Sequence, residues 1–138
     1  MKKNMSFMLA VVMLSVFVTP VFAAAPETVQ PLYSNVAEVA AGLRIEESTG
    51  TAYCTGRVEG IYEIPVEVLV QLQVYKNGSW QTLISWSNTG LGYASVSQSF
   101  TIERGYQYRT FVTGYACNDL WLPIETATTY KEVYYPSN

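Results

Sequence analysis

The strongest structural signal in the chain is the stretch VEVLVQLQVYKNGSWQTLISW, which runs from Val66 to Trp86. From Val66 to Val74, every second residue is valine or leucine, and this period of two is typical of a strand with one buried face. Asn77-Gly78 follows, and both residues tolerate the positive φ that a two-residue hairpin turn requires. The stretch therefore predicts an antiparallel hairpin whose valine-rich face is turned toward the core.

The turn also predicts which residues face each other across the hairpin. Counting outward from it pairs Tyr75 with Trp80 and Leu69 with Trp86, on the face opposite the valines. Because side chains alternate strictly along a strand, this second face is predicted to present two tryptophans and a tyrosine to water.

The rest of the chain repeats this strand-and-turn pattern without helical periodicity. Runs of alternating or apolar residues bounded by turn residues predict strands at residues 43–46, 51–59, 66–75, 80–87, 94–102, 106–116 and 126–135. Strands this short and this regularly spaced predict an all-β fold, a seven-stranded antiparallel sandwich.

The turn Ile102-Glu103-Arg104-Gly105-Tyr106-Gln107-Tyr108 resembles a turn of fibronectin type III and immunoglobulin-like domains. In those domains an apolar residue, a glycine and a tyrosine recur three residues apart. The resemblance implies that Tyr108 fills one end of the core and that its hydroxyl bonds to the backbone of the turn. It also implies that the following strand lies beside the valine-rich strand, which places Arg109, Phe111 and Tyr115 on the same outer face as the tryptophans.

A wider resemblance covers most of residues 42–135. The stretches TGTAYCTGRVEG, VYKNGSWQTLISWS, ERGYQYRTFVT and TTYKEVYY are similar to small secreted β-sandwich proteins of Gram-positive bacteria, a family with no assigned function. The resemblance implies the fold and export of the protein, and it brings no catalytic or binding residue with it.

The first residues have the three parts of a secretory signal peptide. Met1-Lys2-Lys3 is basic, Phe7 to Val18 is apolar, and Val21-Phe22-Ala23 offers small residues to a signal peptidase. We therefore expect residues 1–23 to be removed as the signal peptide, with a second possible cleavage after Ala25. The protein is accordingly predicted to be secreted to the extracellular space.

The mature chain is expected to have two parts, an N-terminal arm at 24–41 and a β-sandwich domain at 42–138. Once Lys2 and Lys3 are removed, six basic residues remain against eleven acidic ones. This acidity argues against nucleic acid as a partner. After the signal, no apolar run is long enough to cross a membrane, so no transmembrane segment is expected in the mature chain.

The residues for common catalytic chemistry are missing. The chain has no histidine, which is the commonest general base and metal ligand. No group of cysteines has the spacing of a metal site, so we expect no catalytic residue, no metal and no cofactor. Glu59, Glu63 and Glu67 suggest a carboxylate hydrolase as a remote alternative. A solvated edge is the favoured interpretation of these three residues, because acidic residues normally stay exposed to solvent. The sequence therefore predicts a protein that is not an enzyme.

The two cysteines, Cys54 and Cys117, give conflicting predictions. An even number of cysteines in an exported chain favours a disulfide. In an immunoglobulin-like sandwich, however, Cys54 lies near the start of its strand and Cys117 at the far end of another, about 20 Å apart at 3.3 Å per residue. A disulfide needs Cα atoms within about 7 Å. Composition predicts a bond and topology opposes it.

The outer face of the hairpin is the candidate ligand-binding surface. It is predicted to contain Tyr75, Trp80, Trp86, Phe111 and Tyr115, with Trp121 in a later loop as a further contact. Aromatic rings among glutamines and arginine suit a sugar or a peptide, because rings cover apolar C–H faces while polar groups bind hydroxyls. The favoured hypothesis is a non-catalytic binding or interaction module for a cell-envelope glycan or an extracellular protein.

Three alternatives remain open for this surface and for the protein. The rings could pair with one another across the strands without any ligand. The arm at 24–41 could lie over them. The protein could also be a secreted toxin- or bacteriocin-like antibacterial protein.

Overall fold

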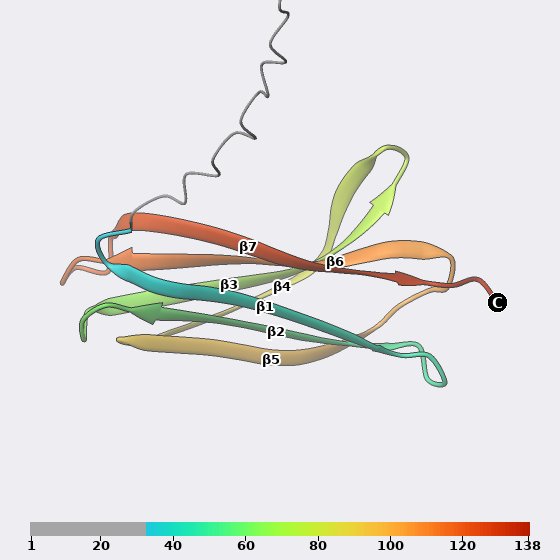
Figure 1. The fold of residues 1–138 in the computed structure, drawn as a ribbon, viewed down its shortest axis with the longest axis horizontal. Coiled ribbons are helices and arrows are strands. Elements are labelled where there is room, and N and C mark those ends of the chain that lie inside the picture. The colour runs from blue at the N-terminus through green and yellow to red at the C-terminus, as the bar shows by residue number, and fades with distance from the viewer. Residues whose placement is uncertain (1–32) are drawn as a thin grey trace, which may run out of the picture. The chain divides into compact units, whose positions relative to one another are not determined.

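The computed structural model describes residues 33–138, which form seven strands in two antiparallel sheets (Figure 1). The strands are β1 (Val36–Glu46), β2 (Thr51–Gly60), β3 (Pro65–Lys76), β4 (Ser79–Leu91), β5 (Tyr93–Thr101), β6 (Tyr106–Cys117) and β7 (Pro123–Tyr135). One sheet has the order β1-β2-β5 and the other has the order β4-β3-β6-β7. The prediction of an all-β, antiparallel fold is confirmed. Residues 33–138 contain no helix that could cross a membrane.

The first strand begins earlier than the sequence predicted. β1 starts at Val36 and pairs with β2 along its length, so residues 36–41 belong to a sheet and not to an arm. Val39 and Ala41 pack against the core, because they alternate in the same phase as Leu43 and Ile45. Val36 is buried as well, on the other side of a register shift between Val36 and Glu38. The boundary at Gly42 was therefore wrong. The predicted signal peptide and the arm residues before 33 lie outside the described residues.

The core lies between the valine-rich face of β3 and the inner faces of the neighbouring strands. Val66, Val68, Val70, Leu72 and Val74 are all buried, as the alternation predicted. Full burial of such side chains stabilises a fold by about 1.5–3 kcal/mol each. These five residues of β3 therefore form the centre of the fold.

Two glycines let the sheets approach closely at this core. A Cβ on Gly56 of β2 would lie 2.8 Å from the Cγ2 atom of Val112, and one on Gly114 of β6 would lie 2.7 Å from the Cγ2 atom of Val58. Carbon atoms that are not bonded pack at about 3.5–4.0 Å, so neither position has room for a larger residue. The same contacts show that β2 and β6 run in the same direction in opposite sheets.

A bulge divides the predicted hairpin into two registers. Tyr75 pairs with Trp80 and Gln73 with Thr82, as predicted. The register then shifts, Leu72 pairs with Ile84, and Trp86 pairs with Val70 rather than with Leu69. The predicted Leu69–Trp86 pair is therefore wrong.

The extra residue in β4 turns Ile84 and Trp86 toward the core, where both are half-buried. A bulge also increases the local twist of a strand pair. Figure 1 shows the resulting shape, in which the yellow-green end of the β3–β4 hairpin stands away from the other strands.

Tyr108 closes one end of the core. Its hydroxyl donates a hydrogen bond of 2.7 Å to the carbonyl oxygen of Glu103 and accepts one of 3.1 Å from the Glu103 backbone N–H. The predicted contact between this tyrosine and its turn is confirmed. Tyr135 has a similar role that the sequence did not predict, since its hydroxyl donates to the carbonyl oxygen of Glu47 at 3.0 Å. The two tyrosines secure the turns at the same end of the sheets.

Cys54 and Cys117 are both buried and both free. Cys54 neighbours Thr110 across the core, and Cys117 lies seven residues beyond Thr110 at the end of β6, about 20 Å further along the strand. The disulfide expected from composition is therefore absent, and the separation of the two cysteines expected from the topology is confirmed. Burial raises the pKa of both thiols; the Thr110 hydroxyl partly offsets this for Cys54, and the charge of Glu67 adds to it for Cys117.

The close approach of the sheets predicts unequal effects of alanine at two neighbouring glycines. Gly56→Ala should lower the free energy of unfolding by about 1–3 kcal/mol, because the new methyl group meets Val70 and Val112 in the core. Gly42→Ala is the matched control, since its methyl group would meet the hydroxyl end of Thr55 on the outer face. Urea unfolding followed by circular dichroism measures both. Equal destabilisation would contradict the packing described.

The free thiols predict a specific pattern of reactivity. A raised pKa leaves less thiolate at pH 8, and burial blocks access, so a thiol reagent should modify the folded protein slowly. In guanidinium, the unfolded protein should react at two thiols without any reducing agent, and the unfolded Cys117→Ser variant should react at one. A reducing agent should leave the unfolding midpoint unchanged. A midpoint that falls on reduction would show a disulfide.

Candidate functional site

The outer face of the four-stranded sheet carries rows of side chains that cross β4, β3, β6 and β7. Three rows lie nearest the hairpin: Trp80, Tyr75, Gln107 and Tyr134; then Thr82, Gln73, Arg109 and Glu132; then Ser85, Gln71, Phe111 and Tyr130. These twelve residues are called the aromatic face below. They share it because paired residues on neighbouring strands point to the same side of a sheet.

Arg109 is the centre of the aromatic face. Its guanidinium carbon lies 4.3 Å from the centroid of the Trp80 ring, 5.0 Å from that of Phe111 and 5.6 Å from that of Tyr130. Its Nε atom donates a hydrogen bond of 2.7 Å to Oε1 of Gln73. A cation over an aromatic ring is stabilising by about 0.5–2 kcal/mol, depending on its exposure to water. Arg109 therefore covers one face of Trp80 and is held in a fixed orientation.

The rings also contact each other directly. Tyr75 and Trp80 meet edge to face, with ring centroids 5.3 Å apart and an angle of 62° between the planes. Such a cross-strand pair contributes about 0.2–1 kcal/mol. The hypothesis that these rings pair within the sheet is confirmed for Tyr75 and Trp80. The covering group for Trp80 is an arginine from β6, and residues 36–41 of the predicted arm belong to the other sheet.

Part of the aromatic face stays open to solvent. The rings of Tyr75, Tyr130 and Tyr134 are 44%, 56% and 54% exposed. Within residues 33–138, Arg109 is in no ion pair and its Nη atoms have no hydrogen-bond acceptor. Its cross-strand neighbour Glu132 is exposed and belongs to no ion pair of the described chain. The accessible ring of Tyr130 thus lies beside a half-buried guanidinium that still has free N–H groups, and the exposed rings of Tyr75 and Tyr134 belong to the adjoining row.

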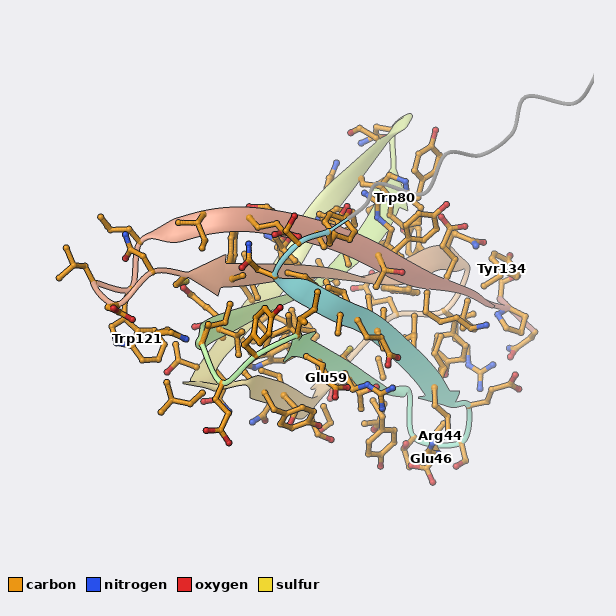
Figure 2. The ribbon with its side chains drawn as sticks, turned by 60° about the vertical axis from the view of Figure 1, so that its left-hand side comes forward. Arg44, Glu46, Glu59, Trp80, Trp121 and Tyr134 are labelled. Carbon is orange, nitrogen blue, oxygen red and sulfur yellow. The ribbon has the colours of Figure 1, made fainter. Side chains whose placement is uncertain are left out.

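Not all predicted site residues belong to this cluster. Trp86 lies on the inner face because of the bulge, which corrects its assignment to the outer surface. Tyr115 is on the outer face, but about 13 Å along β6 from Phe111. Trp121 lies in the loop after β6, and Figure 2 shows it at the opposite end of the domain from Trp80 and Tyr134.

The sequence-based prediction missed Tyr130 and Tyr134 as site residues and did not recognise the central position of Arg109. A usable signal was present, because Tyr130, Glu132 and Tyr134 alternate along β7 and so share a face. The alternation along β7 does not, however, indicate which strand β7 pairs with. Pairing with β6 places Tyr130 opposite Phe111 and brings it to Arg109.

The described residues offer little for metal or carboxylate chemistry. No group of three or more cysteine, aspartate or glutamate side chains in residues 33–138 could hold a metal ion. Glu59 pairs with Tyr93 in the three-stranded sheet, and Glu67 pairs with Tyr115 in the other sheet. Both lie on outer faces, so the two carboxylates point away from each other and do not form a pair.

The chain was compared with protein-family models, curated proteins and solved structures, and none of them matched. A function is therefore inferred from the geometry of the chain's own residues.

The cluster predicts an energetic coupling between Arg109 and Trp80. In a double-mutant cycle with Arg109→Met and Trp80→Ala, the coupling free energy should be about 1 kcal/mol, because each substitution removes the same cation–π contact. The control cycle uses Arg44, which stacks on Tyr53 in the other sheet, and its coupling to Trp80 should be near zero. Chemical denaturation gives the four free energies of each cycle. Additive effects of Arg109→Met and Trp80→Ala would contradict the contact.

Proposed function

We propose that this protein is a secreted, non-catalytic binding module that holds a cell-envelope glycan on its aromatic face. The fold proposed for it is an immunoglobulin- or fibronectin type III-like sandwich. The strand orders β1-β2-β5 and β4-β3-β6-β7, together with the hydroxyl contact of Tyr108, support this fold. The signal-like residues 1–23 support export.

The observation that carries the proposal is the fixed guanidinium of Arg109 among exposed tyrosine rings. A sugar ring has an apolar C–H face that stacks on an aromatic side chain, and hydroxyl groups at its edge that accept hydrogen bonds. Tyr130 offers an accessible ring beside the Nη donors of Arg109, and Tyr134 offers a second ring in the adjoining row. Because Gln73 and Trp80 already hold Arg109 in place, a ligand would not have to order it.

The same arginine favours a glycan that carries a carboxylate. A guanidinium binds a carboxylate through two parallel hydrogen bonds, and these charge-assisted bonds are about twice as strong as neutral ones. Glu132 lies beside Arg109 and would repel an anionic group on the β7 side. The carboxylate of the glycan is therefore proposed to bind Arg109 on the side of Trp80 and Gln73.

Titration calorimetry with soluble peptidoglycan fragments, which contain acidic groups, and with neutral chitin oligosaccharides tests the proposal. Tyr130→Ala should weaken binding of both classes about tenfold, equivalent to about 1.4 kcal/mol, through loss of a stacking ring. Arg109→Gln should weaken binding of the acidic fragments more than that of the neutral ones.

The matched control is Tyr93→Ala, which removes a tyrosine of similar exposure, 51%, from the edge of the other sheet. Its glycan affinity should equal that of the unchanged protein. The proposal fails if neither class of glycan binds, or if Tyr93→Ala reduces binding as much as Tyr130→Ala does.

A further inference from the structure

A second surface lies at the end of the domain away from the hairpin, where three connections meet. The β2–β3 connection joins the β4–β5 corner through two backbone hydrogen bonds, from Gly60 N–H to the Gly92 oxygen at 2.9 Å and from Gly92 N–H to the Ile64 oxygen at 2.8 Å. The β6–β7 loop is at the same end, because Ala116 of β6 pairs with Val66 at the start of β3. These three connections are called the loop end below.

The loop end exposes large apolar side chains from each connection. They are Ile61, Tyr62, Leu91, Leu120, Trp121 and Leu122. Leu120 is 78% exposed, Leu91 67% and Tyr62 65%. Single exposed apolar residues are normal on a protein surface, but six of them on three connections at one end of the domain are a candidate contact surface.

The β6–β7 loop is held in one conformation that presents these residues. Oδ1 of Asn118 accepts hydrogen bonds from the backbone N–H groups of Leu120 at 2.9 Å and Leu122 at 3.0 Å. Trp121 has a φ of 61°, in the left-handed region that favours glycine. A tryptophan at such a position costs about 1 kcal/mol or more in backbone strain. The loop therefore keeps a large side chain at a position where glycine would be less strained.

The unpaired charges at the loop end are all negative. Glu59, Glu63, Glu67 and Asp119 lie in the connections or within two residues of a strand end there. Within residues 33–138, none of these four carboxylates is in an ion pair, whereas the carboxylate of Glu125 at the same end accepts hydrogen bonds from Asn35 and Val36. The nearest basic residue along these strands, Arg57, is already paired with Glu38 at 2.6 Å. An apolar centre is therefore surrounded by uncompensated negative charge.

We propose that the loop end docks a protein partner that presents an apolar patch flanked by lysine or arginine. Complementary charge increases the association rate and excludes partners of the wrong sign. A second copy docked end to end would bring two acidic surfaces together. An anionic membrane would be repelled by the same carboxylates. The proposal is independent of glycan binding, because Trp121 and Trp80 lie at opposite ends of the domain.

The test uses two synthetic amphipathic peptides of equal length and identical leucine pattern, one with lysine and one with glutamate at the polar positions. Fluorescence anisotropy of the labelled peptides, titrated with the full protein, gives each affinity. The lysine peptide should bind at least tenfold more tightly than the glutamate peptide, and its affinity should fall with added salt.

Two double variants separate the apolar and charged contributions. Leu120→Ser with Leu122→Ser should weaken binding of the lysine peptide at least tenfold. Glu63→Gln with Asp119→Asn should weaken it several-fold and flatten its salt dependence. All four residues are exposed, so the variants should fold, and circular dichroism checks this. Tyr130→Ala, on the aromatic face, is the control and should leave peptide affinity unchanged.

Several results would overturn the proposal. They are equal affinity for the two peptides, unchanged affinity in the leucine variant, or a loss in Tyr130→Ala as large as in the leucine variant. Binding to phosphatidylcholine vesicles that shifts tryptophan emission to the blue, and is lost in Trp121→Ala, would make the occupant a lipid surface. A concentration-dependent dimer that the leucine variant abolishes, seen by sedimentation velocity, would make it a second copy.

Discussion

The structure depends on the close contact between the valine-rich face of β3 and the facing strands. Gly56 and Gly114 bring the two sheets so near that a methyl group at either position would clash with valine. That contact decides the direction of every side chain on β3, because successive residues point to opposite faces. Once the valines are inside, Tyr75, Gln73 and Gln71 must be outside. The aromatic face is therefore a consequence of the core.

The two tryptophans of the hairpin have different environments because of one bulge. Trp80 precedes the shift in register and stays on the outer face, where Arg109 covers one side of its ring. Trp86 follows the shift and packs against the core. The domain thus presents two separate surfaces at its opposite ends. One has aromatic rings around a cation, and the other has apolar loops surrounded by carboxylates.

Much of the fold could be predicted, because turn residues and alternation act over a few neighbouring residues. The hairpin, its Tyr75–Trp80 pair and the hydroxyl contact of Tyr108 were predicted in this way. The start of β1 at Val36 was missed, because VAEVAA has a weak pattern and becomes a strand by pairing with β2. The disulfide was predicted from composition, which carries no information about the distance between Cys54 and Cys117.

The candidate site was predicted in part. The predicted part depends on neighbouring residues in one hairpin, and the part that was not predicted depends on contacts between strands that are distant in the sequence. The sequence by itself determined that Tyr75 and Trp80 lie together on a face without valines, because an Asn-Gly turn and a period of two require it. Only the tertiary structure decided that the guanidinium of Arg109 contacts Trp80 and that Tyr130 joins the face, since these residues lie 29 and 50 residues beyond Trp80 along the chain. It also decided that Trp86 leaves the face. A bulge forms where burying Ile84 and Trp86 stabilises the domain more than continuous pairing does, and that balance depends on the opposing sheet.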